Sequence, residues 1–360
     1  MRLGTNTVNE IFLIVNPKHI NMNEHKTIML AHGGGGRLME ELISRTIVPR
    51  LGSGQSVQLT DSALLDVPAG KLCFTTDSFV VKPLFFSGGD IGKLAVCGTV
   101  NDLAVAGARP MALSLSLILE EGLAMDTLEA VLDSIAQTAR AAGVQIITGD
   151  TKVVEKGAAD QIFINTAGIG MRLQNAKPGY EHIQPGDVIL LNGPLGSHGL
   201  TILLQRQGLE FQTMLASDCA CLHELTAMLY ENIGRSVKFM RDPTRGGAAA
   251  VLNEIARAAS VCIEIKETDL PADKTVQAAA DMLGFDILNV ANEGKVLAVV
   301  APEAAETALA LWRSHPLGRD AAIIGTITRS EDKALVELIT RIGGRRIVPT
   351  PYGRELPRIC

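Results

Sequence analysis

The sequence has no apolar run of about 18 or more residues, the length that a membrane-spanning helix needs, so no membrane association is expected. It has no excess of positive charge either. The 33 Lys and Arg against 39 Asp and Glu give a formal net charge of −6, which argues against nucleic-acid binding. Cysteine is sparse, with six in 360 residues, and the pattern Cys219-x-Cys221-x-His223 has no second ligand pair at zinc-site spacing. We therefore expect reduced thiols and a cytoplasmic protein.

Two common nucleotide-binding motifs are also missing, because neither G-x-x-x-x-G-K-[ST] nor GxGxxG occurs. The chain instead contains "AHGGGGRLMEEL", in which four glycines precede a predicted helix: Gly33, Gly34, Gly35 and Gly36. Glycine lets the backbone approach a ligand closely, and amide groups before a helix N-terminus favour phosphate. The stretch predicts a phosphate cradle, with a flexible surface turn as the alternative.

Apolar, β-rich runs alternate along the chain with patterns typical of helices, which predicts an α/β (α+β) fold. Strands are predicted at 71–77, 114–122, 144–150, 161–170, 188–193, 262–266, 296–301 and 321–327. Helices are predicted at 91–108, 125–143, 197–207, 221–233, 245–260, 274–284 and 303–313. A connector rich in Pro and Gly at 176–187 predicts a domain boundary.

The chain therefore divides into an N-terminal extension, two domains and a tail. Their expected bounds are 1–27, 28–175, 176–345 and 346–360. Met22 would serve equally well as a start, so the extension is given little functional weight. Three prolines make a regular element in the tail unlikely, and an extended arm of this length reaches roughly 35 Å. The arm ends in a thiol, Cys360, for which an incidental residue at a frayed end is the alternative.

Three acidic residues lie at predicted junctions. Asp77 and Asp150 each follow a strand-like run, and Asp102 interrupts an apolar helix next to Asn101. A lone buried carboxylate is costly, so it needs a cation or hydrogen-bond donors. Three carboxylates that converge at one sheet edge would hold Mg²⁺ and, through it, a triphosphate. Taken singly, each aspartate could equally be a helix cap or turn residue.

Lys152 in "GDTKVV" lies two residues after Asp150, close to any phosphate bound there. Glu293 in "NVANEGK" follows an apolar segment, where a carboxylate can act as a general base. Arg245 in "RDPTRGG" is a candidate phosphate contact. For the first two the alternative is a surface ion pair, and for Arg245 it is a loop before a helix.

The motifs together resemble one known family. They are "AHGGGG", "FTTDSFVV", "PLFFSGGDIGKLAVCGTVNDLAVAGA", "ILEEGL", "ITGDTKVV", "FINTAGIG", "RDPTRGG", "NEGK", "SHPLG" and the terminal "PRIC". Their order and spacing resemble the HypE family of hydrogenase expression/formation proteins over residues 28–360. The wider superfamily resembles aminoimidazole ribonucleotide synthetase. The resemblance implies a PurM-like two-domain fold: an ATP-binding N-terminal domain whose sheet forms a homodimer with nucleotide near the interface, a C-terminal α/β domain and an extended tail.

The resemblance also implies an ATP- and Mg²⁺-dependent carbamoyl dehydratase. The carbamoyltransferase HypF would load a carbamoyl group onto Cys360, and dehydration would give a protein thiocyanate. The cyanide would then pass to iron on the HypC–HypD complex for [NiFe]-hydrogenase. The implied catalytic residues are Cys360, Glu293 as proton acceptor and Lys152 as stabiliser, and those two roles are interchangeable at this stage. The expected nucleotide ligands are Gly33 to Gly36, Asp77, Asn101, Asp102, Gly149, Asp150, Thr151 and Arg245, with Asp77, Asp102 and Asp150 holding the metal.

Two other functions remain open at this level. Selenophosphate synthetase, from the same superfamily, would need a reactive Cys or selenocysteine near the glycine-rich loop, where this chain has His32 and no cysteine. A non-catalytic scaffold would bind nucleotide and present a thiol to its partners. It would differ from an enzyme because its release of ADP would not depend on a carbamoylated Cys360.

Overall fold

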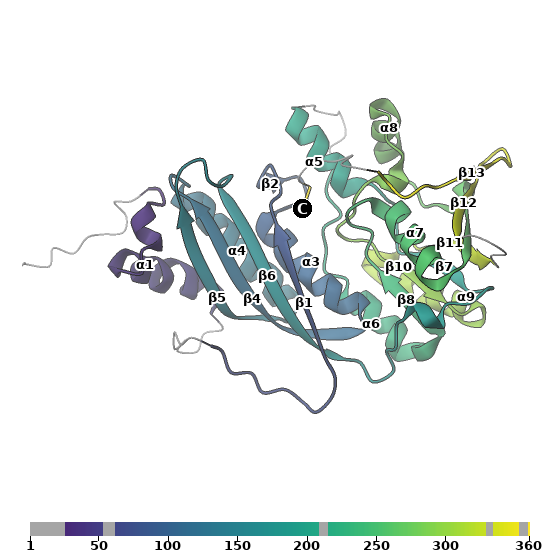
Figure 1. The fold of residues 1–360 in the computed structure, drawn as a ribbon, viewed down its shortest axis with the longest axis horizontal. Helices are drawn as coiled ribbons and strands as arrows, with labels where there is room; N and C mark the ends of the chain where they lie inside the picture. Colours follow the sequence, from purple (N-terminus) through teal and green to yellow (C-terminus); the bar gives the residue numbers. More distant parts are fainter. Residues whose placement is uncertain (1–25, 53–61, 209–214, 329–333, 353–358) are drawn as a thin grey trace, which may run out of the picture.

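The structure is a computed structural model that describes residues 26–52, 62–208, 215–328, 334–352 and 359–360. It contains a four-stranded and a seven-stranded sheet, which occupy opposite ends of an elongated molecule (Figure 1). In the described part of the chain, no helix is long and apolar enough to cross a membrane.

The N-terminal sheet has the strand order β1-β6-β4-β5. Its strands are β1 (Leu72–Phe79), β4 (Ala108–Glu120), β5 (Gln145–Val154) and β6 (Ile162–Arg172). Only β4 and β5 run parallel, and helix α4 (Met125–Ala141) makes the crossover between them. Helix α3 (Ile91–Val105) joins α4 on the same face, while α1 (Arg37–Leu42), a π-helical turn (Ile43–Ile47) and α2 (Val48–Leu51) lie at the β5 edge.

The two long helices differ in the pattern that fixes their position. In α4 the buried residues recur at helical spacing, with Leu128, Val131 and Ile135 facing the core. In α3 almost every residue is buried, because the helix lies between the N-terminal sheet and α6 of the C-terminal half. Asp90 caps α3 by accepting hydrogen bonds from the backbone N–H groups of Gly92 and Lys93.

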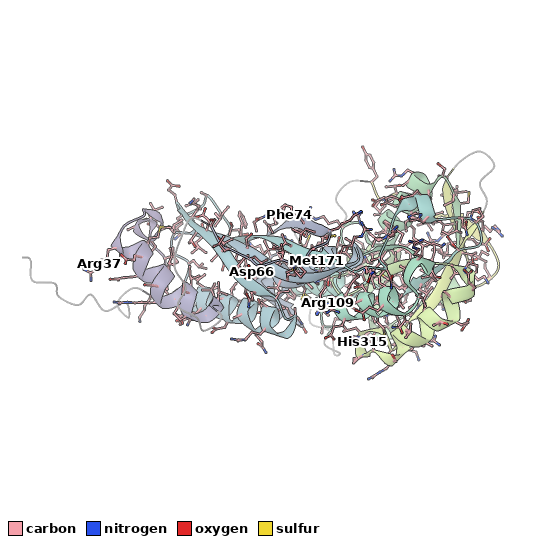
Figure 2. All side chains as sticks on the ribbon, turned by 90° about the horizontal axis from the view of Figure 1, so that it is seen from below. Arg37, Asp66, Phe74, Arg109, Met171 and His315 are labelled. Carbon is pink, nitrogen blue, oxygen red and sulfur yellow. The ribbon has the colours of Figure 1, made fainter. Side chains whose placement is uncertain are left out.

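Among the residues that the structure describes, no helix covers the opposite face of the N-terminal sheet (Figure 2). The side chains of β1 alternate, so Thr75 and Asp77 face α3 while Leu72 and Phe74 are 52% and 72% exposed. Figure 2 shows Phe74 on this open face. Ile118 of β4 is exposed there as well, so large apolar side chains gather on an uncovered sheet, which is typical of a protein–protein interface.

The C-terminal sheet has the strand order β13-β12-β9-β11-β7-β10-β8. Its strands are β7 (Val188–Leu191), β8 (Val237–Arg241), β9 (Cys262–Lys266), β10 (Leu297–Val300), β11 (Ala322–Thr328), β12 (Leu335–Ile339) and β13 (Arg345–Ile347). Its helices are α5 (Ser197–Gln207), α6 (His223–Asn232), α7 (Gly247–Ala259), α8 (Lys274–Leu283) and α9 (Ala305–Ser314). A short hairpin of β2 (Phe85–Phe86) and β3 (Gly89–Asp90) precedes α3.

The sequence prediction for the tail was partly wrong. Residues 345–347 form β13, which pairs with β12 and completes the sheet edge, so the predicted arm from 346 begins inside a strand. Backbone pairing with β12 supplies the order that the local sequence does not suggest. Residues 1–25 and 353–358, which include most of the predicted extension and part of the tail, lie outside the described residues.

Candidate active site

The glycine-rich stretch lies against the edge strand β5. A Cβ added to Gly33 would lie 2.9 Å from both Cβ and backbone N of Val153, so this contact admits only glycine. Gly35 has φ of +75°, and Gly36 precedes α1. The backbone of this loop is therefore brought next to β5 by packing that a larger residue would prevent.

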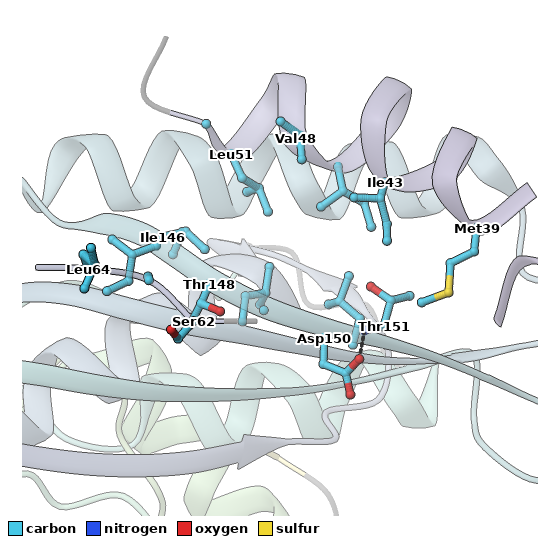
Figure 3. Close-up of a pocket in the computed structure, with 17 residues that line it drawn as sticks. Met39, Ile43, Val48, Leu51, Ser62, Leu64, Ile146, Thr148, Asp150 and Thr151 are labelled. Atoms are coloured by element: carbon cyan, nitrogen blue, oxygen red, sulfur yellow. Dashed lines mark hydrogen bonds between the residues drawn. The ribbon is translucent and has the colours of Figure 1, made fainter. Parts of the chain in front are cut away.

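A pocket of about 680 Å³ opens beside this loop, between α1, α2 and β5 (Figure 3). Its walls are mainly apolar and come from Met39, Ile43, Ile47, Val48, Leu51, Leu64, Leu115, Leu117, Ile146 and Ile147. It ends at Gly149, Asp150 and Thr151. Such a volume, with apolar walls and polar groups at one end, is typical of a small-molecule site.

Asp150 and Lys152 lie on the open face of the sheet. Lys152 Nζ is 2.9 Å from the Asp150 carboxylate, and its hydrogen bond lowers the pKa of Asp150 although burial opposes it. Thr151, between them, is buried and turned toward the helices, while the Asp150 side chain points away from them (Figure 3). Both charged groups are more than half exposed, so they are accessible to another molecule on this face.

The last two residues form a second group, at the junction of the two halves, where Figure 1 places the chain end. Ile359 is buried in the core of the N-terminal half, and the backbone N–H of Val80 donates to the Cys360 oxygen at 3.2 Å. Arg245 Nε lies 3.1 Å from Cys360 Sγ. Burial raises the pKa of the Cys360 thiol, while Arg245 acts to lower it. The predicted thiol is therefore inside the protein and next to a cation.

Glu293 faces the same region. It is 3% exposed, and Oε1 has no hydrogen-bond partner among the described residues. Burial raises the pKa of Glu293 well above its ordinary value, and the negative charge of a Cys360 thiolate raises it further. A buried carboxylate with a raised pKa and a free oxygen is suited to accept a proton near neutral pH.

Three carboxylates surround the β1 side of this junction. Asp77 lies beside Gly98 of α3, and Asp102 Oδ2 accepts a hydrogen bond from Thr75 Oγ1 at 2.8 Å. Burial raises the pKa of Asp102, and Asp77 adds to this shift. Asp242, which directly follows β8, is buried, and burial together with the charges of Asp102 and Asp77 raises its pKa to about 7.

The prediction that Asp77, Asp102 and Asp150 converge was wrong for a single chain. Asp77 and Asp150 lie inside β1 and β5, not after them, and these are the two edge strands of the sheet. Three strand spacings, roughly 14 Å, therefore separate them, and their side chains point to opposite faces. Lys152 is exposed on the open face of β5, whereas Glu293 is buried in the junction near Cys360, so one chain does not bring these two residues together.

Asn101 was expected to contact nucleotide, but its amide is engaged within the protein. Nδ2 donates to the backbone oxygens of Ala220 and Glu293, and Oδ1 accepts from the backbone N–H of Leu222 at 2.7 Å. These three bonds hold the Glu293 backbone and the start of α6 against α3. The structure therefore gives Asn101 a positioning role for Glu293 in place of a ligand role.

Two residues of the junction escaped the sequence analysis. Asp242 stands in the quoted motif "RDPTRGG", next to the predicted ligand Arg245, yet nothing local shows that β8 ends beside α3. His198 contacts the backbone oxygen of Ile359 at 2.6 Å, which no sequence pattern reveals.

Comparisons with known proteins agree with this architecture. Two family models of the AIR synthase related protein match the chain. The model of the N-terminal domain matches residues 59–172, and the model of the C-terminal domain matches residues 184–337. The chain is 49% identical to "Carbamoyl dehydratase HypE" of Bradyrhizobium diazoefficiens over 92% of this chain and 95% of that protein. A crystal structure of hydrogenase maturation protein HypE in complex with ATP matches with TM-score 0.89 and 45% identity, covering 93% of this chain and all of that one. A HypE–HypF complex matches with TM-score 0.76 and 45% identity, over 88% of this chain and all of the other.

Proposed function

The chain belongs to the HypE family of carbamoyl dehydratases, and we propose on this basis that it dehydrates a carbamoyl group carried on Cys360 to a thiocyanate. The reaction is ATP-dependent and supplies the cyanide ligand of iron in [NiFe]-hydrogenase maturation. One observation supports this function above the others: the terminal thiol lies inside the protein, between Arg245 and the buried base Glu293.

The residues present fit ATP. The apolar pocket beside β5 has room for a flat base, and Gly33 packs against Val153, two residues after Thr151 of the pocket lining. A solved HypE structure that is 45% identical to this chain is a complex with ATP. We assign the base to this pocket and the phosphates to the glycine loop, Gly149, Asp150 and Thr151, with Arg245 as a further phosphate contact from the junction.

The residues also fit Mg²⁺ held jointly by protein and phosphate. In the described ranges, no group of three or more His, Cys, Asp or Glu side chains is arranged to hold one metal ion. Mg²⁺ commonly takes one or two carboxylates and completes its ligands with phosphate and water. Asp77, Asp102 and Asp150 remain our proposed ligands, and the buried Asp242 is added to them because the charges of Asp102 and Asp77 raise its pKa.

Phosphorylation of the carbamoyl oxygen is the chemistry that ATP supplies, and it makes that oxygen a leaving group. Transfer of the phosphoryl group to the carbamoyl oxygen releases ADP and one N–H proton, and loss of phosphate with the second N–H proton then leaves S–C≡N on Cys360. Glu293 accepts the second proton, and burial keeps water away from its unpaired oxygen. Arg245 holds the sulfur, and Lys152 stabilises the charge that develops on the oxygen.

Lys152 and Glu293 can share one site if two copies of the chain build it. We propose a homodimer that packs the two open sheet faces together about a two-fold axis along the strands. This axis lays β5 of one copy over β1 of the other, because rotation about it exchanges the two sheet edges. Asp150 and Lys152 of one copy then lie over β1 of the other, and because β1 is an edge strand they can reach its Asp77 and chain end around that edge.

Replacing Phe74 by Glu tests the interface. A charge on the open face of β1 would be buried by dimerisation without a partner, so the dissociation constant of the dimer should rise by roughly 30-fold or more. Sedimentation velocity across a concentration series measures this change. The matched control is Ile342→Glu, because Ile342 is 96% exposed but belongs to the opposite half of the molecule. A Phe74→Glu protein that dimerises like the control would exclude this face.

We propose HypF as the carbamoyl donor, since a relative has been solved as a HypE–HypF complex. The HypC–HypD iron complex is the proposed acceptor of the cyanide, and the cytoplasm the proposed location. Both the donor and the acceptor must reach Cys360, so the tail has to leave the junction for each of these two encounters and return to it in between.

The function is tested by following the mass of the C-terminal peptide of the full-length chain. After carbamoylation, the peptide that ends at Cys360 should carry a carbamoyl group, and addition of Mg²⁺ and ATP should remove one water from it while ADP appears. An adduct on a different cysteine would refute the assignment. ATP binding without loss of water would identify the chain as a scaffold.

A further inference from the structure

His198 is a fully buried histidine near the start of α5 that the reaction described above does not use. Both of its ring nitrogens are engaged. Nδ1 lies 2.8 Å from Ser217 Oγ, and Nε2 lies 2.6 Å from the backbone oxygen of Ile359. Phe86 packs edge-on against the ring, with 5.6 Å between the centroids. The imidazole therefore spans from the 217–219 loop to the end of the chain.

The contact with Ile359 fixes which tautomer a neutral ring adopts. A carbonyl oxygen can only accept, so Nε2 must carry the proton that is donated to Ile359. Nδ1 then accepts from the Ser217 hydroxyl, whose oxygen also accepts from the backbone N–H of Cys219 at 3.1 Å. Burial lowers the pKa of His198, which agrees with a neutral ring.

The same loop also holds the proposed base. Asp218 follows Ser217, and its Oδ1 accepts from the backbone N–H of Glu293 at 3.2 Å. Its other oxygen is 3.1 Å from Lys295 Nζ in a buried ion pair. Burial acts to raise the pKa of Asp218, but Lys295 and the surrounding donors lower it below the ordinary value. One short loop thus places both the ring that contacts the tail and the backbone of Glu293.

We propose that His198 is a positioning residue for dehydration: by donating to the Ile359 carbonyl, it holds the terminal thiol at a fixed place relative to Glu293 and Arg245. When the tail leaves, a buried N–H loses its acceptor, which favours return of the tail. The ligand recognised is the main-chain carbonyl one residue before the terminal cysteine. The expected effect on the dehydration rate rests on the proposed function, whereas the contact between His198 and the tail does not.

The experiment compares His198→Leu, which removes the donor, with His198→Gln, which keeps an N–H at similar reach. His182→Gln, at an exposed histidine, is the control. Two rates are measured on the full-length chain: alkylation of uncarbamoylated Cys360 by iodoacetamide, and single-turnover dehydration of the carbamoylated chain at saturating ATP. His198→Leu should speed alkylation and slow dehydration, each by about 10- to 100-fold, the range expected when the buried Ile359 carbonyl loses its hydrogen-bond donor. His198→Gln should recover most of both rates, with ATP affinity unchanged in every variant.

The proposal would be overturned if His198→Leu kept both wild-type rates. It would also be overturned if the Leu and Gln variants changed the alkylation and dehydration rates equally. If His198→Leu is alkylated faster but the wild-type chain shows no dehydration, the proposed function is refuted and the contact between His198 and the tail still stands. If His198→Leu does not fold, ¹⁵N NMR of the wild-type ring decides. An Nε2–H signal that shifts when Cys360 is alkylated supports the contact, and one that does not respond overturns it.

Discussion

Replacing Glu293 by Gln should slow dehydration of carbamoylated Cys360 by roughly 100- to 10,000-fold, the usual contribution of a positioned general base. Gln has nearly the same shape but cannot accept the N–H proton. ATP affinity should not change, because Glu293 belongs to the junction and not to the pocket beside β5. Single-turnover mass measurement of the C-terminal peptide gives the rate. Glu306→Gln, at an exposed position of α9, is the matched control.

The pH dependence gives a second signature of the same residue. Burial raises the pKa of Glu293, and only the carboxylate form accepts a proton, so the wild-type rate should rise as pH increases through that raised pKa. The Gln variant should lose this rise. A variant that keeps more than about a tenth of the wild-type rate, with the same pH profile, would remove Glu293 from the proton-transfer step.

Mixing two inactive variants should restore activity if each site is shared between copies. In a dimer of one Glu293→Gln chain and one Lys152→Ala chain, one of the two sites contains both native residues and the other contains neither. Random co-assembly makes half of the dimers mixed, so about a quarter of wild-type activity should return. Co-expression with two affinity tags allows the mixed dimer to be purified, and a single-turnover assay on it should recover about half of wild-type activity, since one of its two sites is intact.

The control pair combines two residues that the structure places in one chain. Cys360 lies beside Arg245 and Glu293 of its own chain, so Glu293→Gln mixed with Cys360→Ser should recover nothing. Recovery in the control pair but not in the first would show that the tail exchanges between copies and that Lys152 acts within its own chain. That result would contradict the dimer proposed above.

The sequence predicted those elements whose pattern is local. Helix α4 was recognisable because its apolar residues recur at helical spacing over 17 residues. β8 and β13 were not, because "VKFMR" and "RRI" are short and charged, and only pairing with distant strands orders them. The strands were also predicted to end too early, so Asp77 and Asp150 were expected after β1 and β5, whereas both residues lie inside those strands.

The sequence predicted the site only in part, and the cause is similar. Asp77 and Asp150 look equivalent in sequence, yet a side chain's face depends on strand register, and a shift of one residue reverses it. Glu293 and Cys360 were identified from the motifs that carry the resemblance. Asp242 and His198 act through contacts between segments far apart in the chain, and no local pattern contains that information.

The terminal thiol lies in the interior of the same chain that carries it, so the thiol is covalently tethered to its own site. A tethered reactant has an effective concentration set by the length of its connection and not by how much protein is present. Dilution should therefore leave the chemical step of a loaded dimer unchanged while it slows every encounter with donor and acceptor. Under the proposed function, the thiol carries one carbamoyl group per loading, so cyanide supply should follow how often each chain is reloaded.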